Sequence, residues 1–159
     1  MNGKATLSPD DLARACADAM WKDDDASTGL GMKIVEVGPG RATLSMRVQP
    51  HMVNGQRIAH GGFIFTLADS AFAFACNSHN EKAVAAHGSI TFIKPGKLGD
   101  ELVAAAREVS RNGRSGIYDV RVTVGNEVVA EFRGHSRSIG GPLVRATVDD
   151  DENRPAETT

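Results

Sequence analysis

The sequence is poor in several features that would assign the protein to a particular class. Its 159 residues include two cysteines, Cys16 and Cys76, which are too few for a disulfide framework and lack the spacing of a zinc site. The formal net charge is -2 and the sequence pI is about 6.2, so no basic excess exists to neutralise nucleic-acid phosphates. We therefore expect no nucleic-acid partner.

Long apolar runs and targeting signals are also missing. No apolar run is long enough to span a bilayer, and the stretch 60–78 is interrupted by Asp69. The N-terminal residues lack the apolar segment of a secretory signal. We therefore expect no membrane partner and a cytoplasmic location, where thiols stay reduced.

Two kinds of site find no support in the sequence. There is no G-x-S-x-G motif, so nothing points to the Ser–His–Asp triad of an α/β-hydrolase. Four of the histidines show no metal-ligand spacing, and we expect neither a metal ion nor a cofactor; they are His51, His79, His87 and His135.

The apolar content, 41%, is ordinary for one globular domain, and its pattern predicts the secondary structure. Ser8, Pro9 and Asp11 predict the start of a helix within residues 8–24. Residues 60–78 predict a second helix that is apolar on every face and buried on most sides. Turn residues and, most clearly in the second of these segments, apolar–polar alternation predict six strands, over 31–38, 41–49, 83–94, 101–110, 115–124 and 127–138.

The order of these elements predicts the fold class. Tight turns at Gly38-Pro39-Gly40, Asn112-Gly113 and Gly125-Asn126 join consecutive strands, so the sheet should be mostly antiparallel. One long apolar helix needs one curved sheet to wrap it, which is an α+β arrangement with an extra N-terminal helix. We divide the chain into a helix and linker (1–29), the main domain (30–141) and a polar tail (142–159) that we expect to be disordered.

The most informative motif is His60-Gly61-Gly62 at the start of the long apolar helix. Asn54 lies six residues before it and Asp69 nine residues after it. A carboxylate is costly to bury, so Asp69 indicates a partner or a task. Glycines at a helix start leave backbone N–H groups open to a substrate. Together these residues supply donors for an oxyanion and a carboxylate for attack on a carbonyl.

Each of these residues also has a purely structural interpretation. Asp69 taken alone fits a buried structural acid, and the two glycines fit a tight loop-to-helix turn. Asn54-Gly55 fits an ordinary turn, and His60 fits a helix cap, so we assign His60 a supporting role. Burial should raise the pKa of Asp69 and nearby donors should lower it, and the sequence does not decide which effect is larger.

Four segments and the element order carry a resemblance to a known family. The segments are HGGFIFTLADSAFAFACNS, ITFIKPGKLGDEL, GIYDV and FRGHSRSIGG. Over about residues 30–141 the chain resembles the hot-dog-fold thioesterases, specifically the acyl-CoA thioesterases of phenylacetate degradation. The resemblance implies the hot-dog fold, a curved antiparallel sheet around one central helix, and homodimers that usually pair into homotetramers. It also implies hydrolysis of phenylacetyl-CoA or hydroxyphenylacetyl-CoA to the free acid and CoA.

The expected chemistry gives each catalytic candidate a role. The Gly61 N–H and the Asn54 carboxamide hold the thioester oxygen, Asp69 is the base or the nucleophile, and His60 supports the helix start. Gly61 and Asp69 are eight residues apart on one helix, about 12 Å along its axis, so they cannot both contact one carbonyl. We therefore expect Asp69 of another subunit to face Gly61 and Asn54 of the first.

Substrate-binding candidates follow from the resemblance, from helix spacing and from the charge of the CoA phosphates. Gly62, and Ala73 one turn after Asp69, should belong to the site wall. Some relatives carry a hydroxyl near the start of the third strand that holds the attacking water, and here Ala85 stands in that place. Three arginines are candidates for contacting the CoA phosphates, although a solvated strand face explains each equally well; they are Arg111, Arg114 and Arg137.

Two alternative functions remain open at this point. One is a hot-dog hydratase or dehydratase, which would pair a catalytic histidine with an acid. The other is a non-catalytic module that binds or senses acyl-CoA, and such a module would tolerate the loss of Asp69.

Overall fold

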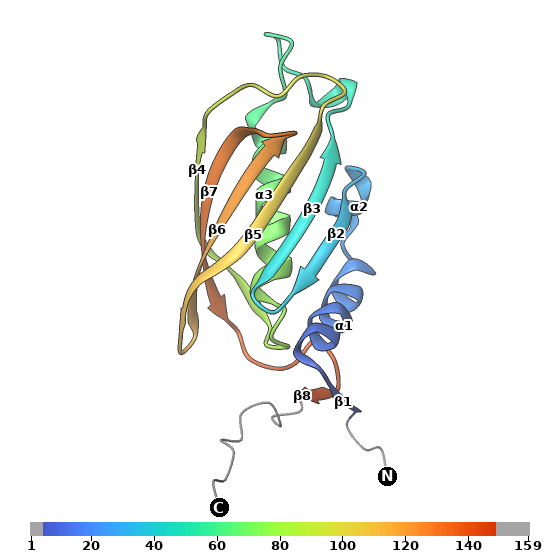
Figure 1. Ribbon diagram of the computed structural model, residues 1–159, viewed down its shortest axis with the longest axis vertical. Helices are drawn as coiled ribbons and strands as arrows, with labels where there is room; N and C mark the ends of the chain where they lie inside the picture. The colour runs from blue at the N-terminus through green and yellow to red at the C-terminus, as the bar shows by residue number, and fades with distance from the viewer. Residues whose placement is uncertain (1–4, 149–159) are drawn as a thin grey trace, which may run out of the picture.

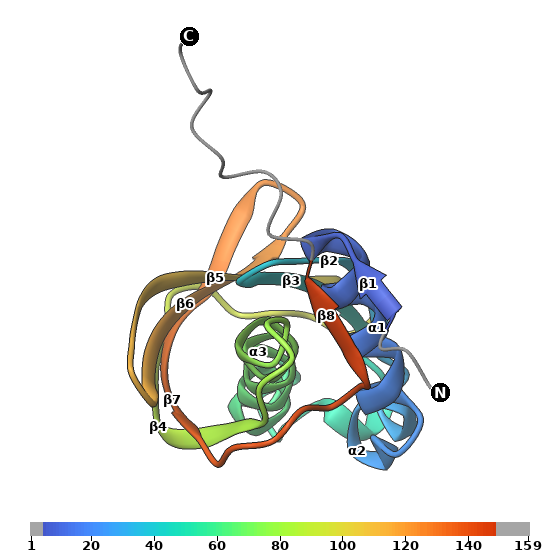
Figure 2. The same ribbon diagram turned by 90° about the horizontal axis from the view of Figure 1, so that it is seen from below.

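The computed structural model describes residues 5–148 and shows one curved sheet around a central helix, α3 (Gly61–Cys76) (Figure 1). The six strands of the sheet have the order β2-β3-β5-β6-β7-β4, and all neighbours are antiparallel. They are β2 (Lys33–Gly38), β3 (Arg41–Arg47), β4 (Ala83–Phe92), β5 (Glu101–Asn112), β6 (Ser115–Val124) and β7 (Glu127–Ser138). Seen from below in Figure 2, the sheet curls around α3, which confirms the expected hot-dog fold.

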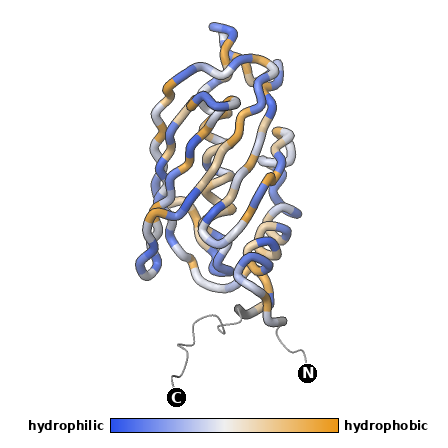
Figure 3. Tube along the Cα trace, in the orientation of Figure 1, coloured by the Kyte–Doolittle hydropathy of each residue, from blue (hydrophilic) through white to orange (hydrophobic). Residues whose placement is uncertain are grey.

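The core lies between α3 and the concave face of the sheet. Leu67, Phe72 and Phe74 of α3 are each no more than 1% exposed, and they belong to the same cluster as Leu102 and Val120 of the sheet. Hydrophilic and hydrophobic residues alternate along the strands (Figure 3), which puts the apolar residues on the side of the helix. Burial of this apolar surface is the main force that holds the helix in the sheet.

Two of the predicted turns join β5 to β6 and β6 to β7. Gly113 and Gly125 have φ of 57° and 56°, a left-handed backbone that glycine adopts at no steric cost. In the first of these turns Asn112 pairs with Ser115, so the two loop residues are Gly113 and Arg114 rather than Asn112 and Gly113. The hairpin prediction is confirmed with its turn one residue further along the chain.

The N-terminal helix is α1 (Pro9–Trp21), and Ser8 caps it as predicted, since its hydroxyl accepts the Asp11 N–H at 3.1 Å. A second short helix, α2 (Asp25–Gly29), was not predicted. It begins in the acidic run Asp23-Asp24-Asp25, where the Asp24 carboxylate caps α2 by accepting the N–H of Ser27 at 2.9 Å.

The tail expected to be disordered from residue 142 onward begins with an ordered segment. Residues 146–148 form β8 (Ala146–Val148), which pairs in parallel with β1 (Ala5–Leu7). Asn80 explains this order, because its side-chain oxygen accepts the N–H groups of Leu143 and Val144 at 2.9 Å. The expectation is therefore wrong for residues 142–148, and residues 149–159 lie outside the described part. Within residues 5–148 no helix is long and apolar enough to cross a membrane.

Candidate active site

The first turn of α3 leaves one backbone donor open. His60 is the N-cap, and its Nδ1 accepts the Gly62 N–H at 2.9 Å, while its own N–H donates to the Met52 carbonyl at 2.8 Å. The Gly62 N–H is therefore already used. Among the described residues the Gly61 N–H has no acceptor, and it lies at the positive end of the helix dipole. His60 thus has the capping role expected of it.

Asn54 sits in a tight loop just before the helix. Its side-chain oxygen accepts the N–H groups of Gln56 at 2.9 Å and Ile58 at 3.3 Å. Two donors aimed at the same atom identify that atom as the oxygen, which settles the orientation of the amide. No hydrogen bond within residues 5–148 uses the side-chain NH₂ group, so this group remains able to donate to a ligand.

Gly61 and Asn54 line one cavity of about 460 Å³, a volume in the range of small-molecule sites. The other lining residues come from the loop before α3, from α3 itself and from the end of β4. The full lining is Asn54, Ile58, Ala59, Gly61, Ile64, Phe92, Ile93, Lys94 and Pro95. Gly61 and Asn54, the two residues predicted to supply the oxyanion donors, thus line the same cavity, and the wall around them is mostly apolar.

Asp69 lies half-buried in the middle of α3 and is not part of that lining. Burial raises the pKa of its carboxyl group. Within residues 5–148 the carboxylate makes neither a hydrogen bond nor an ion pair, so it is not a structural acid held by a loop N–H. In the balance that the sequence left open, burial is therefore the larger effect.

One stripe of α3 is left partly uncovered by its own sheet, and Asp69 belongs to it. Gly62 is exposed, and Thr66, Asp69 and Ala73 are half-buried, at positions that follow one another along a single face of the helix. The Thr66 hydroxyl donates to the Gly62 carbonyl at 2.8 Å. A carboxylate, a hydroxyl and a small alanine thus share a face that another surface can approach.

Ala85 lies on the edge strand β4, on the concave side of the sheet. It pairs with Ser136 of β7, whose side chain is buried on the concave face, so Ala85 points to the same side. Ala85 is itself exposed. The strand therefore carries a methyl group, and no hydroxyl, at this position on the helix side of the sheet.

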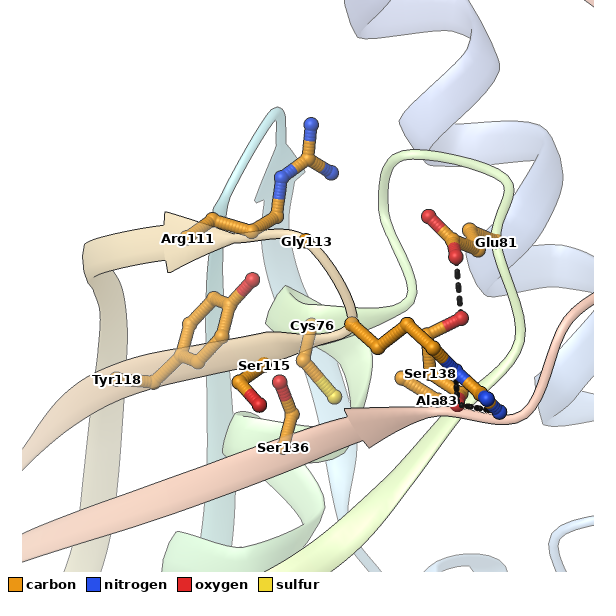
Figure 4. A pocket seen from close by; sticks show the side chains of 10 residues that line it. Cys76, Glu81, Ala83, Arg111, Gly113, Ser115, Tyr118, Ser136 and Ser138 are labelled. Atoms are coloured by element: carbon orange, nitrogen blue, oxygen red, sulfur yellow. Dashed lines mark hydrogen bonds between the residues drawn. The ribbon is translucent and has the colours of Figure 1, made fainter.

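The three arginines lie away from the Gly61 cavity of the same chain. Arg111 and Arg114 line a small cavity of about 20 Å³ near the last residue of α3, Cys76 (Figure 4). The Arg114 guanidinium donates to the Ser138 carbonyl at 2.9 and 3.2 Å, which fixes the β5–β6 turn against β7. Arg137 is exposed on the outer face of β7. The cationic residue that lines the Gly61 cavity is Lys94. The sequence pattern gave no reason to select it instead of the three arginines.

A polar cluster that the sequence gave no reason to expect lies near the end of α3. His79 Nε2 is 2.8 Å from Glu108 Oε2, and the buried Tyr118 hydroxyl donates to the same oxygen at 2.9 Å. Partial burial alone would raise the pKa of Glu108, but the hydrogen bonds from His79 and Tyr118 outweigh it and lower that pKa. Burial, followed by the neighbouring carboxylate, raises the pKa of Tyr118. The cluster ties the helix end to β5 and β6.

Aromatic residues near the site divide into core and cavity wall. Phe72 and Phe74 are fully buried, so these two cannot wall a pocket for an acyl group, whereas Phe63 and Phe65 remain half-buried. Phe92 is 51% exposed and lies in the cavity with Gly61. The sequence signal for it was only its place at the end of a strand before Pro95-Gly96.

Comparison with known proteins identifies the family. Residues 56–131 match the family described as the thioesterase superfamily. The chain is 41% identical over 128 residues to the acyl-coenzyme A thioesterase PaaI of Escherichia coli, which covers 80% of this chain and 91% of that protein. The structure of the E. coli PaaI protein, from the phenylacetic acid degradation operon, matches with a TM-score of 0.83 and 38% identity over 89% of this chain and all of that one.

A second similar protein was solved with a ligand. The protein smu.793 from Streptococcus mutans, bound to acetyl CoA, has a TM-score of 0.68 and 30% identity over 70% of this chain and 90% of that chain. The identity to PaaI, over most of both chains, shows common descent rather than a shared fold alone. The chain therefore belongs to the thioesterase superfamily, and its sheet wrapped around α3 is that family's hot-dog fold.

Proposed function

We propose that the protein is an acyl-CoA thioesterase that hydrolyses phenylacetyl-CoA or hydroxyphenylacetyl-CoA to the free acid and CoA. The observation that carries the proposal is the cavity that Gly61, with its unused N–H, and Asn54, with its unused NH₂ group, both line. PaaI, the relative named above, supports acyl-CoA as the substrate class.

The geometry suits attack on a thioester carbonyl. As the tetrahedral intermediate forms, its oxygen gains negative charge, and the Gly61 N–H and the Asn54 NH₂ donate to it. One such donor contributes about 3–4 kcal/mol to transition-state stabilisation. The thiolate of CoA then leaves and takes up a proton.

Asp69 supplies the other half of the reaction. It either accepts a proton from the attacking water or attacks the carbonyl itself and forms an anhydride that water hydrolyses. Both routes consume one water and give the same products. Both also require the ionised carboxylate, and a carboxylate without fixed partners is free to play either part.

We propose that Asp69 acts on the cavity of a second copy of the chain. The spacing of about 12 Å from Gly61 prevents it from reaching the carbonyl held in its own cavity. The uncovered stripe of α3 and the exposed edge strand β4, with Val84 47% exposed, are the surfaces that we propose for this contact. The minimum assembly is then a homodimer. We extend this to a homotetramer, the usual assembly of the family.

A two-fold contact also gives the arginines a place. A two-fold axis perpendicular to α3 runs the two central helices antiparallel, so the end of one α3 lies beside the start of the other. Arg111 and Arg114, near the end of α3, and the exposed Arg137 would then lie closer to the partner's cavity than to their own. We propose that they and Lys94 bind the CoA phosphates.

The location proposed for the enzyme is the cytoplasm. Cys16 and Cys76 are both free and buried, as is common for proteins kept in a reducing compartment.

The direct test measures thiol release from phenylacetyl-CoA with a disulfide reagent, for the wild-type chain and for Asp69→Asn. Wild type should release CoA, and Asp69→Asn should bind the thioester with little release. Release by Asp69→Asn at the wild-type rate would refute the assigned chemistry. Binding without release by the wild-type chain would favour a sensing module, and water addition to an enoyl-CoA would favour a hydratase.

A further inference from the structure

Phe92 occupies the space that a side chain at position 61 would take. A Cβ atom on Gly61 would lie 2.7 Å from Cζ of Phe92 and 3.2 Å from Cε1 and Cε2. The tip of the ring therefore points at the helix start. Only glycine at position 61 permits this approach. The ring consequently forms a wall of the cavity right beside the proposed oxyanion donor.

The ring is also unusually exposed for its size. Phe92 ends β4 with 51% of its surface accessible, and its neighbour Ile93 is 52% exposed. Isolated apolar residues on a surface need no explanation, but these two line a cavity together with Ile58 and Ile64. A ligand that covers this wall removes apolar surface from water, which favours binding.

The polar and apolar lining residues of the cavity suit different parts of a thioester. In the proposed function Asn54 and the Gly61 N–H donate to the carbonyl oxygen. Lys94 also lines the cavity, with its ammonium 2.8 Å from Glu127. The remaining lining is apolar and has no donor for a polar tail. The carbon chain of the acyl group therefore fits the side of the cavity that Phe92 forms.

We propose, on the basis of the proposed thioesterase function, that Phe92 determines acyl-group specificity by stacking on a planar aromatic acyl group. Aromatic rings prefer offset or edge contacts with one another, and such a contact adds to the free energy gained from burial alone. An aryl-acetyl group carries its ring one carbon from the carbonyl, so a ring beside Gly61 lies within reach. A short alkyl group has no matching surface.

The test compares substrates rather than the rate with one substrate. We replace Phe92 by Leu, which keeps most of the apolar volume, and by Ala, and measure kcat/KM for phenylacetyl-CoA, hexanoyl-CoA and acetyl-CoA. Both variants should lose about tenfold more with phenylacetyl-CoA than with acetyl-CoA, which corresponds to about 1.4 kcal/mol. The loss should fall mainly on KM. Val35→Ala is the matched control, because Val35 is 62% exposed on β2 at the other edge of the sheet.

The outcomes separate the two proposals. An equal loss of kcat/KM for all three thioesters would mean that Phe92 contacts the CoA arm or the assembly. Wild-type kcat/KM for all three thioesters would mean that Phe92 makes no contact with the substrate. Either result overturns the specificity role. Size-exclusion chromatography and thermal melting of Phe92→Leu show whether assembly and folding are retained. Failure of the wild-type chain to release thiol from any thioester would instead refute the thioesterase function.

Discussion

A site shared between two chains can be tested by mixing two inactive variants. Asp69→Ala removes the carboxylate, and Asn54→Ala removes one oxyanion donor; each alone should lower kcat by about 100-fold or more. In a mixed dimer, one site combines the intact Asn54 of the first chain with the intact Asp69 of the second. The other site lacks both residues.

The expected magnitude follows from counting sites. After equal mixing with free exchange of subunits, half of the dimers are mixed and each has one of its two sites intact. The mixture should therefore recover about one quarter of the wild-type activity. If each chain contained a complete site, Asp69 and Asn54 would act in the same chain, and the mixture would stay as inactive as its components.

The assay is thiol release after the variants are refolded together or co-expressed with different tags. The matched control mixes wild type with the double variant Asp69→Ala/Asn54→Ala. Mixed dimers then contain no intact site, so activity should fall to about one quarter, whereas independent chains would give about one half. A mixture of single variants without activity, together with a control at one half, would refute the shared site.

Three further predictions concern single residues. Gly61→Ala should abolish most thiol release because its Cβ would overlap Phe92. Adding Phe92→Ala in the same chain should recover part of that release. No recovery would mean that the overlap with Phe92 is not the cause of the loss. Burial raises the pKa of Asp69, so kcat/KM should fall on acidification at a pH above the ordinary aspartate value of about 4. A raised carboxyl pKa costs stability once the group ionises, so Asp69→Asn should raise the melting temperature at pH 7 but not at pH 3. A variant that melts at the wild-type temperature at both pH values would contradict this. Tyr118→Phe should cost about 1–2 kcal/mol in denaturant unfolding at neutral pH. Because the pKa of Glu108 is lowered, the stability from this contact should be present above the unfolded-state pKa and lost as the pH falls through the folded value; a cost that persists at low pH would refute the assignment.

The sequence alone determined the parts of the fold that depend on local rules. Apolar–polar alternation, where present, and turn glycines fixed the strands to within a few residues, because pleating and positive φ act over neighbouring positions. The start of α3 was predictable for the same reason, since His60 and Gly62 satisfy each other across two residues. Even the spacing of Gly61 and Asp69 along the helix is a local quantity, and from it the need for a second chain could be inferred.

Only the tertiary structure decided what depends on distant residues. Phe92 meets Gly61 because the edge strand β4 ends beside the start of α3, a contact between residues 31 positions apart that no periodicity reveals. Asn80 orders residues 143 and 144 in the same way. The sequence pattern around Arg111 and Arg114 is also that of a solvated strand face. Only the sheet order and the packing show that these two arginines lie near the end of α3. Local sequence patterns determine where helices and strands form. Long-range packing determines which side chains are in contact, because those contacts form only when the whole sheet closes around the helix.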